Sequence, residues 1–89
     1  MITIEKTTDK EYRITIEEKS SKSVHKVTVE PEYYQKITQG KISMEEYIQL
    51  SFEFLLKREP KESILPAFNI QVINRYFPEY EKVMHQTIS

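Results

Sequence analysis

The sequence predicts an α+β fold in one domain, residues 1–89, with a three-stranded antiparallel meander over 1–30 and a helical part over 31–89. Apolar and polar residues alternate through the first part, which is the period of a strand with one face on a core. After Pro31 the apolar residues recur every three to four positions, the period of helices that bury one face. A chain of 89 residues buries only about 60 to 65% of its unfolded surface, so we expect a small core without a deep cleft.

Three strands are expected, near residues 2–6, 11–18 and 24–30. The residues expected on the inner face are Ile2, Ile4, Tyr12, Ile14, Ile16, Val27 and Val29. Registers that keep these residues on one face pair Ile4 with Tyr12 and Ile2 with Ile14 in the first hairpin, and Ile14 with Val29 and Ile16 with Val27 in the second. The second register predicts a turn of four residues, Ser20–Ser23, and places Glu18 opposite His25.

Two helices have clear start signals. Pro31 suits a first helical position, Glu32 favours the positive end of the helix dipole, and Gly40 suits a left-handed cap, so a helix is expected over 31–38. Ser43 and Glu46 have the spacing of a capping box, which predicts that a second helix begins at residue 44. Ile42 and Tyr47 have the spacing of the hydrophobic staple that accompanies such a start.

The second helix, expected over 44–58, is apolar around roughly two thirds of its circumference. Its apolar residues are Met44, Tyr47, Ile48, Leu50, Phe52, Phe54, Leu55 and Leu56. A helix that lies on a sheet needs only one apolar face. We therefore expect this helix to be covered by the sheet on one side and by the C-terminal helices or another subunit on the other.

Three prolines divide the rest of the chain into short helical pieces. Pro60 and Pro78 can each open a helix but not continue one, and Pro66 disrupts any helix that begins at Pro60. Asn69 suits the N-cap of a piece over 70–77. The apolar stripe expected to wrap the central helix comprises Ile64, Leu65, Phe68, Val72, Ile73, Tyr76, Phe77, Tyr80, Val83 and Met84.

The composition narrows the classes of function. No cysteine is present, so disulfides, thiolate nucleophiles and cysteine-ligated zinc are excluded. No apolar run exceeds Phe54–Leu55–Leu56, and the N-terminal residues lack the pattern of a signal peptide, so we expect a cytoplasmic protein outside the membrane. The 13 basic and 14 acidic residues are interleaved, which disfavours a nucleic-acid surface.

The residues for several kinds of chemistry are missing. One glycine cannot build a phosphate-binding loop, and two separate histidines do not form a metal site, so we expect no cofactor and no metal. We expect His25 to pair with Glu18 across the hairpin and His85 to face Glu81 one helical turn away.

Glu59 and Glu62 are three positions apart, yet Arg58 and Lys61 lie beside them, so a solvated charge cluster is favoured over a pair of catalytic carboxylates. Ser63 lacks the glycine-flanked elbow of a serine nucleophile. An enzyme is therefore not favoured, and no catalytic residue is assigned.

Three segments carry a resemblance: Gly40–Ser43, Arg58–Ile64 and Tyr76–Tyr80. With these segments, residues 25–82 resemble a group of short, stand-alone, uncharacterised prokaryotic proteins that have no assigned activity. Pro66 departs from the group, in which helix formers stand at this position. The resemblance implies a prokaryotic cytosolic protein and transfers no site residue.

The favoured hypothesis is a non-enzymatic protein–protein interaction module that associates with itself, for instance as a homodimer, or with another protein. The excess apolar surface of helix 44–58 and the edges of a small sheet favour it. The predicted polar rim of its contact surface is Arg58, Glu59, Lys61, Glu62 and Arg75. The first alternative is nucleic-acid binding through Lys10, Arg13, Lys19, Lys22 and Lys26, and the second is a small hydrolase or isomerase that uses Glu59, Glu62, Ser63 or His25.

Overall fold

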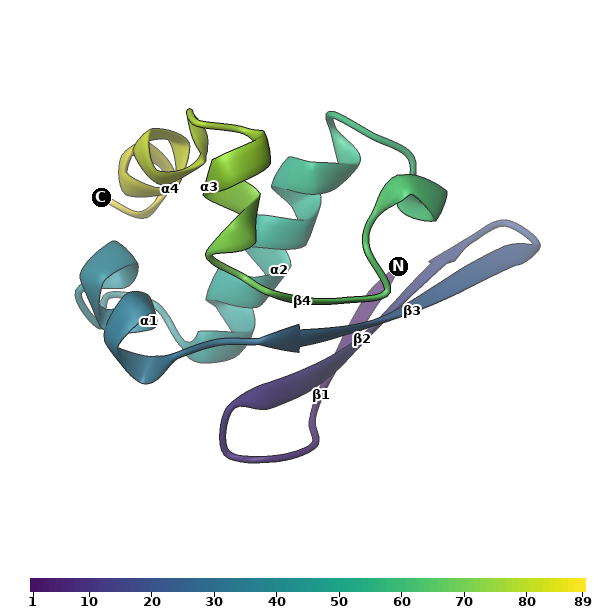
Figure 1. Ribbon diagram of the computed structural model, residues 1–89, viewed down its shortest axis with the longest axis horizontal. Helices are drawn as coiled ribbons and strands as arrows, with labels where there is room; N and C mark the ends of the chain where they lie inside the picture. Colours follow the sequence, from purple (N-terminus) through teal and green to yellow (C-terminus); the bar gives the residue numbers. More distant parts are fainter.

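The computed structural model describes residues 1–89 and has the predicted α+β architecture, with the helices on one face of the sheet (Figure 1). The strands are β1 (Ile2–Lys6), β2 (Glu11–Glu18), β3 (Ser21–Thr28) and β4 (Ala67–Asn69). The helices are α1 (Pro31–Thr38), α2 (Met44–Leu56), the 3-10 helix η1 (Lys61–Ser63), α3 (Val72–Tyr76) and α4 (Tyr80–Ile88).

The sheet has the order β1-β2-β3-β4, so the predicted antiparallel meander is confirmed and a fourth strand is added. β4 runs parallel to β3, with Val27 opposite Phe68. The carbonyl of Pro66 accepts a hydrogen bond from the Lys26 amide at 2.8 Å, and the Ile70 amide donates to the Thr28 carbonyl at 2.9 Å. Three residues are too few for an alternating pattern to reveal a strand, which is why the sequence predicted only helical pieces here.

Both predicted registers are wrong. Ile14 lies opposite Ile4 in the first hairpin and opposite His25 in the second. Each displacement is an even number of residues, so the same side chains stay on the inner face and the apolar pattern cannot distinguish the registers. The second hairpin closes with the pair Glu18 and Ser21 around a two-residue turn, in which Lys19 adopts a φ of 53°. The turn contains no glycine or asparagine, the residues by which a two-residue turn is recognised in a sequence.

The first two helices begin as predicted. α1 spans Pro31–Thr38, but the left-handed backbone begins at Gln39 (φ 54°) and continues through Gly40 (φ 73°). The capping box of α2 is confirmed. The Ser43 hydroxyl accepts from the Glu46 amide at 3.1 Å, and the Glu46 carboxylate accepts from the Ser43 amide at 3.0 Å. α2 ends at Leu56, two residues before the predicted end.

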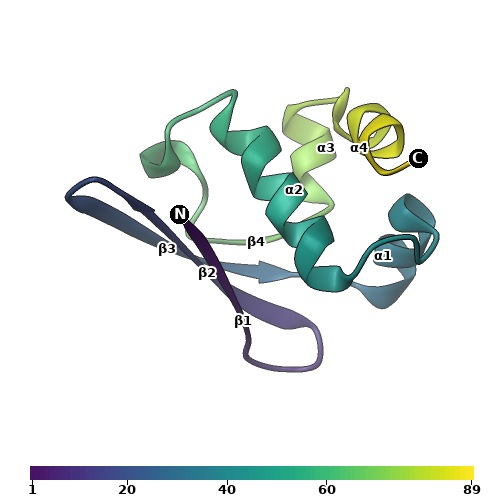
Figure 2. The same cartoon turned by 180° about the vertical axis from the view of Figure 1, so that it is seen from behind.

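α2 is covered on both sides, as predicted, by the sheet and by α4 (Figures 1 and 2). Phe52 is fully buried between the rings of His25 and Phe68. On the other side, the Tyr80 hydroxyl lies 2.7 Å from both the Ser51 and the Tyr47 hydroxyl oxygens. Burial raises the pKa of Tyr80 to about 12 and also raises the pKa of Tyr47. These hydroxyls satisfy one another inside the helical layer.

The C-terminal pieces differ from the prediction in two respects. The Asn69 side chain accepts from the Gln71 amide at 3.0 Å, but α3 begins only at Val72, so Asn69 caps the preceding turn. The predicted apolar stripe is only partly buried, since Leu65 is 42% and Tyr76 66% exposed. In the adjacent pair Ile64–Leu65, Ile64 faces the core and Leu65 faces solvent.

Candidate functional site

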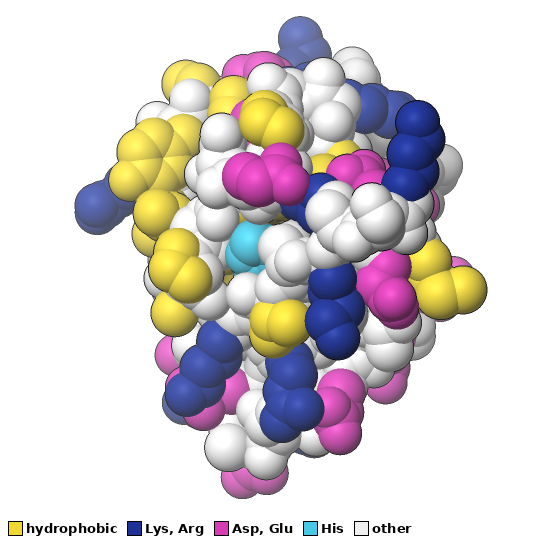
Figure 3. All heavy atoms as spheres, turned by 90° about the vertical axis from the view of Figure 1, so that its right-hand side faces the viewer, with side chains coloured by type: hydrophobic (Ala, Val, Ile, Leu, Met, Phe, Trp, Pro, Cys, Tyr) yellow, Lys and Arg dark blue, Asp and Glu magenta, His cyan; other side chains and the backbone are white.

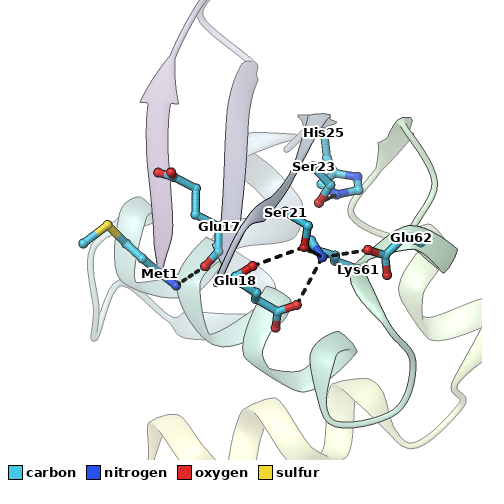
Figure 4. Close-up of polar contacts among 8 residues, drawn as sticks. All are labelled: Met1, Glu17, Glu18, Ser21, Ser23, His25, Lys61 and Glu62. Carbon is cyan, nitrogen blue, oxygen red and sulfur yellow. Dashed lines mark hydrogen bonds and ion pairs between the residues drawn. The ribbon is translucent and has the colours of Figure 1, made fainter.

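A lysine ammonium is enclosed where η1 meets the tip of the β2–β3 hairpin (Figure 4). Lys61 Nζ lies 2.6 Å from Ser21 Oγ, 2.7 Å from Glu62 Oε2 and 3.4 Å from Glu18 Oε1. The Lys61 side chain is 4% exposed, whereas both carboxylates reach solvent. The hydrogen bond to Glu62 raises the pKa of Lys61, and the same bond lowers the pKa of Glu62. Lys61 therefore stays charged at neutral pH and is no candidate for a general base.

Ser23 and His25 form a second polar arrangement on β3 (Figure 4). His25 Nδ1 lies 2.9 Å from the Leu65 carbonyl oxygen and Nε2 lies 2.9 Å from Ser23 Oγ. A carbonyl only accepts, so Nδ1 carries a proton and donates to the Leu65 carbonyl, and Nε2 shares a hydrogen bond with the Ser23 hydroxyl. Residues two apart on a strand share a face, which is the sequence signal that could have found this pair.

These contacts correct the predicted environment of His25. The imidazole is 3% exposed and does not pair with Glu18, whose partner is Lys61. Ser23, His25 and the Leu65 carbonyl have the order of a nucleophile, a base and an orienting group. Neither side chain lines the grooves described below. The arrangement ties β3 to the segment before β4.

An apolar groove, here called the α3 groove, lies between the end of α2, the η1–β4 segment and α3. Its volume is about 400 Å³, and eight of its ten lining residues are hydrophobic, with Glu59 and Ser63 as the others. Leu65 and Tyr76 line it and are the two most exposed large apolar residues in the C-terminal half. The sequence had placed both in the core, so it missed this surface.

The five residues of the predicted rim fall in four places. Glu59 lines the α3 groove, and Arg75 precedes Tyr76 on α3 beside a polar depression. Lys61 and Glu62 belong to the cluster at the hairpin tip. Arg58 Nε lies 3.1 Å from Glu79, and its guanidinium carbon lies 3.5 Å from the centre of the Phe54 ring. Glu59 and Arg75 are the two rim residues without an ion pair.

The basic residues predicted for nucleic-acid binding are largely paired with carboxylates. Lys10 lies 3.1 Å from Glu30, Arg13 lies 3.1 Å from Glu5, and Lys26 lies 3.6 Å from Glu11. Only Lys19 and Lys22 of the five have no ion pair. Figure 3 shows both signs of charge intermixed on this side of the molecule, with hydrophobic side chains gathered along one margin. On this face positive and negative side chains alternate, unlike the continuous positive patch that phosphate binding uses.

No model of a known protein family matches the chain, and no curated protein or solved structure matches it either. None of the helices has the length and apolar character needed to span a membrane. No three side chains among His, Asp and Glu come together as metal ligands. Glu81, predicted to face His85, instead accepts from the Tyr33 hydroxyl at 2.8 Å and lies 4.0 Å from Lys36.

Proposed function

We propose that this chain is a cytoplasmic protein–protein interaction module and that a second copy of the chain docks on the α3 groove. The observation that carries the proposal is an exposed aromatic residue at the border of an apolar groove. The groove has a volume of about 400 Å³, and Tyr76, which lines it, is 66% exposed. Across a twofold axis the Tyr76 ring of each copy would enter the groove of the other. Such an isologous contact uses one patch twice, and buried aromatic residues are common anchors of interfaces.

The charges near the groove support the same arrangement. Glu59 lines it, Arg75 precedes Tyr76 on α3 and lines the neighbouring polar depression, and neither has an ion-pair partner within the chain. Two copies related by a twofold axis would pair Glu59 of each with Arg75 of the other. The remaining lining is apolar apart from Ser63, so the contact would leave few polar groups without a partner.

Sedimentation over a range of concentrations tests the proposal with one matched pair of variants. We expect the natural chain to sediment as a dimer of 10.7 kDa subunits and Tyr76→Arg to sediment as a monomer. Val24→Arg is the control, because Val24 is 51% exposed on the outer face of the sheet and receives the same charge. A natural chain that stays monomeric at every concentration contradicts self-association.

A charge exchange separates the proposed contact from other modes of dimerisation. Glu59→Arg and Arg75→Glu should each weaken the dimer, because each puts like charges together across the axis. The double variant should restore the dimer, by about fivefold or more relative to either single variant, since two ion pairs form again with reversed sign. Failure of the double variant to recover would show that these residues do not meet.

A further inference from the structure

The outer edge of β1 has unused backbone hydrogen-bonding groups. The Glu17 amide donates to the Met1 carbonyl, and the Thr7 amide donates to the Glu11 carbonyl. Hydrogen-bonded pairs alternate with non-bonded pairs in an antiparallel ladder, so Thr3 and Glu5 also bond to β2. The amides and carbonyls of Ile2, Ile4 and Lys6 therefore point away from β2. The segment contains no proline that would block this edge.

A shallow groove, here called the β1 groove, is lined by residues of β1, of α2 and of the segment before α2. Figure 2 shows β1 on the side of the sheet beside α2. Its volume is about 500 Å³. Its apolar residues are Ile2, Ile4, Ile42 and Leu50, and its polar residues are Glu45, Glu46, Gln49 and Glu53. The side chains of Ile2 and Ile4 share the inner face of β1, so the open backbone edge and the groove adjoin each other.

The groove is acidic and contains no compensating cation. Glu45, Glu46 and Glu53 have no ion-pair partner in the chain, although carboxylates elsewhere pair with Lys10, Arg13, Lys26, Lys36, Arg58 and Lys61. Glu46 accepts from the Ser43 amide and Glu53 from the Gln49 side chain, each through one oxygen, so each keeps a second oxygen free. A ligand of this groove must therefore bring positive charge.

We propose that an extended basic segment of another protein adds to β1 as a fifth strand. Its backbone would bond to the amides and carbonyls of Ile2 and Ile4, which is the mode of recognition in which main-chain bonds give affinity and alternate side chains give specificity. The residues opposite Ile2 and Ile4 would point into the β1 groove. Lys or Arg fits there, because the aliphatic stem packs on the isoleucines and Leu50 while the cation reaches the α2 carboxylates.

A second copy of this chain is a poorer occupant of the same edge. Two β1 strands paired across a twofold axis would bring the carboxylates of both α2 helices to one groove, with Lys6 as the only inner-face cation of each β1. Repulsion between these carboxylates disfavours the pairing of two β1 strands. The β1 groove and the α3 groove share no lining residue, so this proposal is independent of the dimer proposed above.

The test uses the full chain and a capped fluorescent peptide in which lysine alternates with threonine. Fluorescence anisotropy should detect binding that weakens as salt is added. Amide hydrogen exchange in the complex should slow at Ile2, Ile4 and Lys6 while Thr3 and Glu5 change little, because only the first three amides face the added strand. A peptide with glutamate in place of lysine should not bind.

Charge variants distinguish binding at the β1 groove from a general attraction between a basic peptide and an acidic protein. Glu45→Gln with Glu53→Gln should weaken the lysine peptide about fivefold, and Glu32→Gln with Glu79→Gln, which changes the net charge equally at residues outside the groove, should not. Glu46 is left intact because it caps α2. Equal weakening by both pairs, or binding without slower exchange at Ile2 and Ile4, would overturn the proposal. Concentration-dependent protection of these amides without peptide would also overturn it, since β1 would then pair with a second copy.

Discussion

The flank of α2 that faces α3 and α4 differs sharply from the flank that faces β1. On the first flank, Phe54 meets the rings of Phe77 and Tyr80 edge to face, with centroids 5.9 and 5.2 Å apart. On the second flank, carboxylates without ion pairs border a strand whose outer backbone groups are free. One flank supplies stability and an apolar contact, and the other offers directional polar contacts. The two surfaces should therefore respond to different substitutions.

The largest expected difference between the flanks is in the free energy of unfolding. Phe54 is 3% exposed, so Phe54→Ala should lower the free energy of unfolding by about 4 kcal/mol through lost burial and a cavity. Ile4→Ala, on the half-buried strand that borders the other flank, should lower it by only about 1 kcal/mol. Urea denaturation monitored by circular dichroism measures both values. Equal losses would mean that the flanks contribute alike and would break the comparison.

The second largest effect is expected at alkaline pH, which should lower the free energy of unfolding through the buried tyrosines on the α4 side of α2. Burial raises the pKa of Tyr80 to about 12 from its usual 10.0, so the folded state holds this proton more tightly than the unfolded state. The stabilisation is complete below pH 10 and is lost as the pH rises to about 12, a change of about 3 kcal/mol for this residue. The raised pKa values of Tyr47 and Lys61 act in the same direction.

Denaturation at a series of alkaline pH values measures this loss. Tyr80→Phe is the control, because phenylalanine cannot ionise and the variant should lose less stability between about pH 10 and 12. The variant starts about 1.5 kcal/mol less stable at neutral pH, since the Ser51 and Tyr47 hydroxyls each lose a buried partner. A natural chain whose stability does not change over this range would show that ionisation of Tyr80 is not coupled to unfolding.

The sequence predicted the layers of this fold better than its surfaces. The alternation in residues 1–30 and the capping box at Ser43 and Glu46 are local signals, and both led to the observed elements. Register was wrong because an even displacement leaves every side chain on its face, and the turn at Lys19 has no glycine to mark it. The short β4 depends on bonds to β3 from residues about forty positions away, which no local pattern contains.

The candidate surfaces depend even more on tertiary contacts. Both the α3 groove and the β1 groove join elements that are distant in sequence. Tyr76 lies on an apolar stripe, and only the packing of α3 leaves it exposed. Glu59 and Arg75 were nominated from their charge, whereas no pattern in the sequence pointed to Glu45 or Glu53. The sequence indicates which residues are polar but not which of them lack a partner after folding.

The smallest expected change in the free energy of unfolding comes from substituting proline at two positions of β1. Thr3→Pro removes an amide that bonds to β2 and should cost about 2 kcal/mol of stability, whereas Lys6→Pro removes an amide that faces outward and should cost about 0.5 kcal/mol or less. Both side chains are exposed, so the direction of the amide is the main difference between the two positions. Thermal unfolding followed by circular dichroism compares them directly.

Lys6→Pro also distinguishes folding from strand addition on the β1 flank. The variant keeps every bond between β1 and β2, yet it removes a donor that an added strand would use, so it should weaken the lysine peptide more than Lys6→Ala does. Lys6→Ala is the matched comparison because it removes the same positive charge. If the two variants bind the peptide equally well, the Lys6 amide takes no part in binding, and strand addition would be confined to Ile2 and Ile4. If Lys6→Pro is as destabilising as Thr3→Pro, the Lys6 amide faces β2 instead, and the open edge on which the β1 groove depends does not exist.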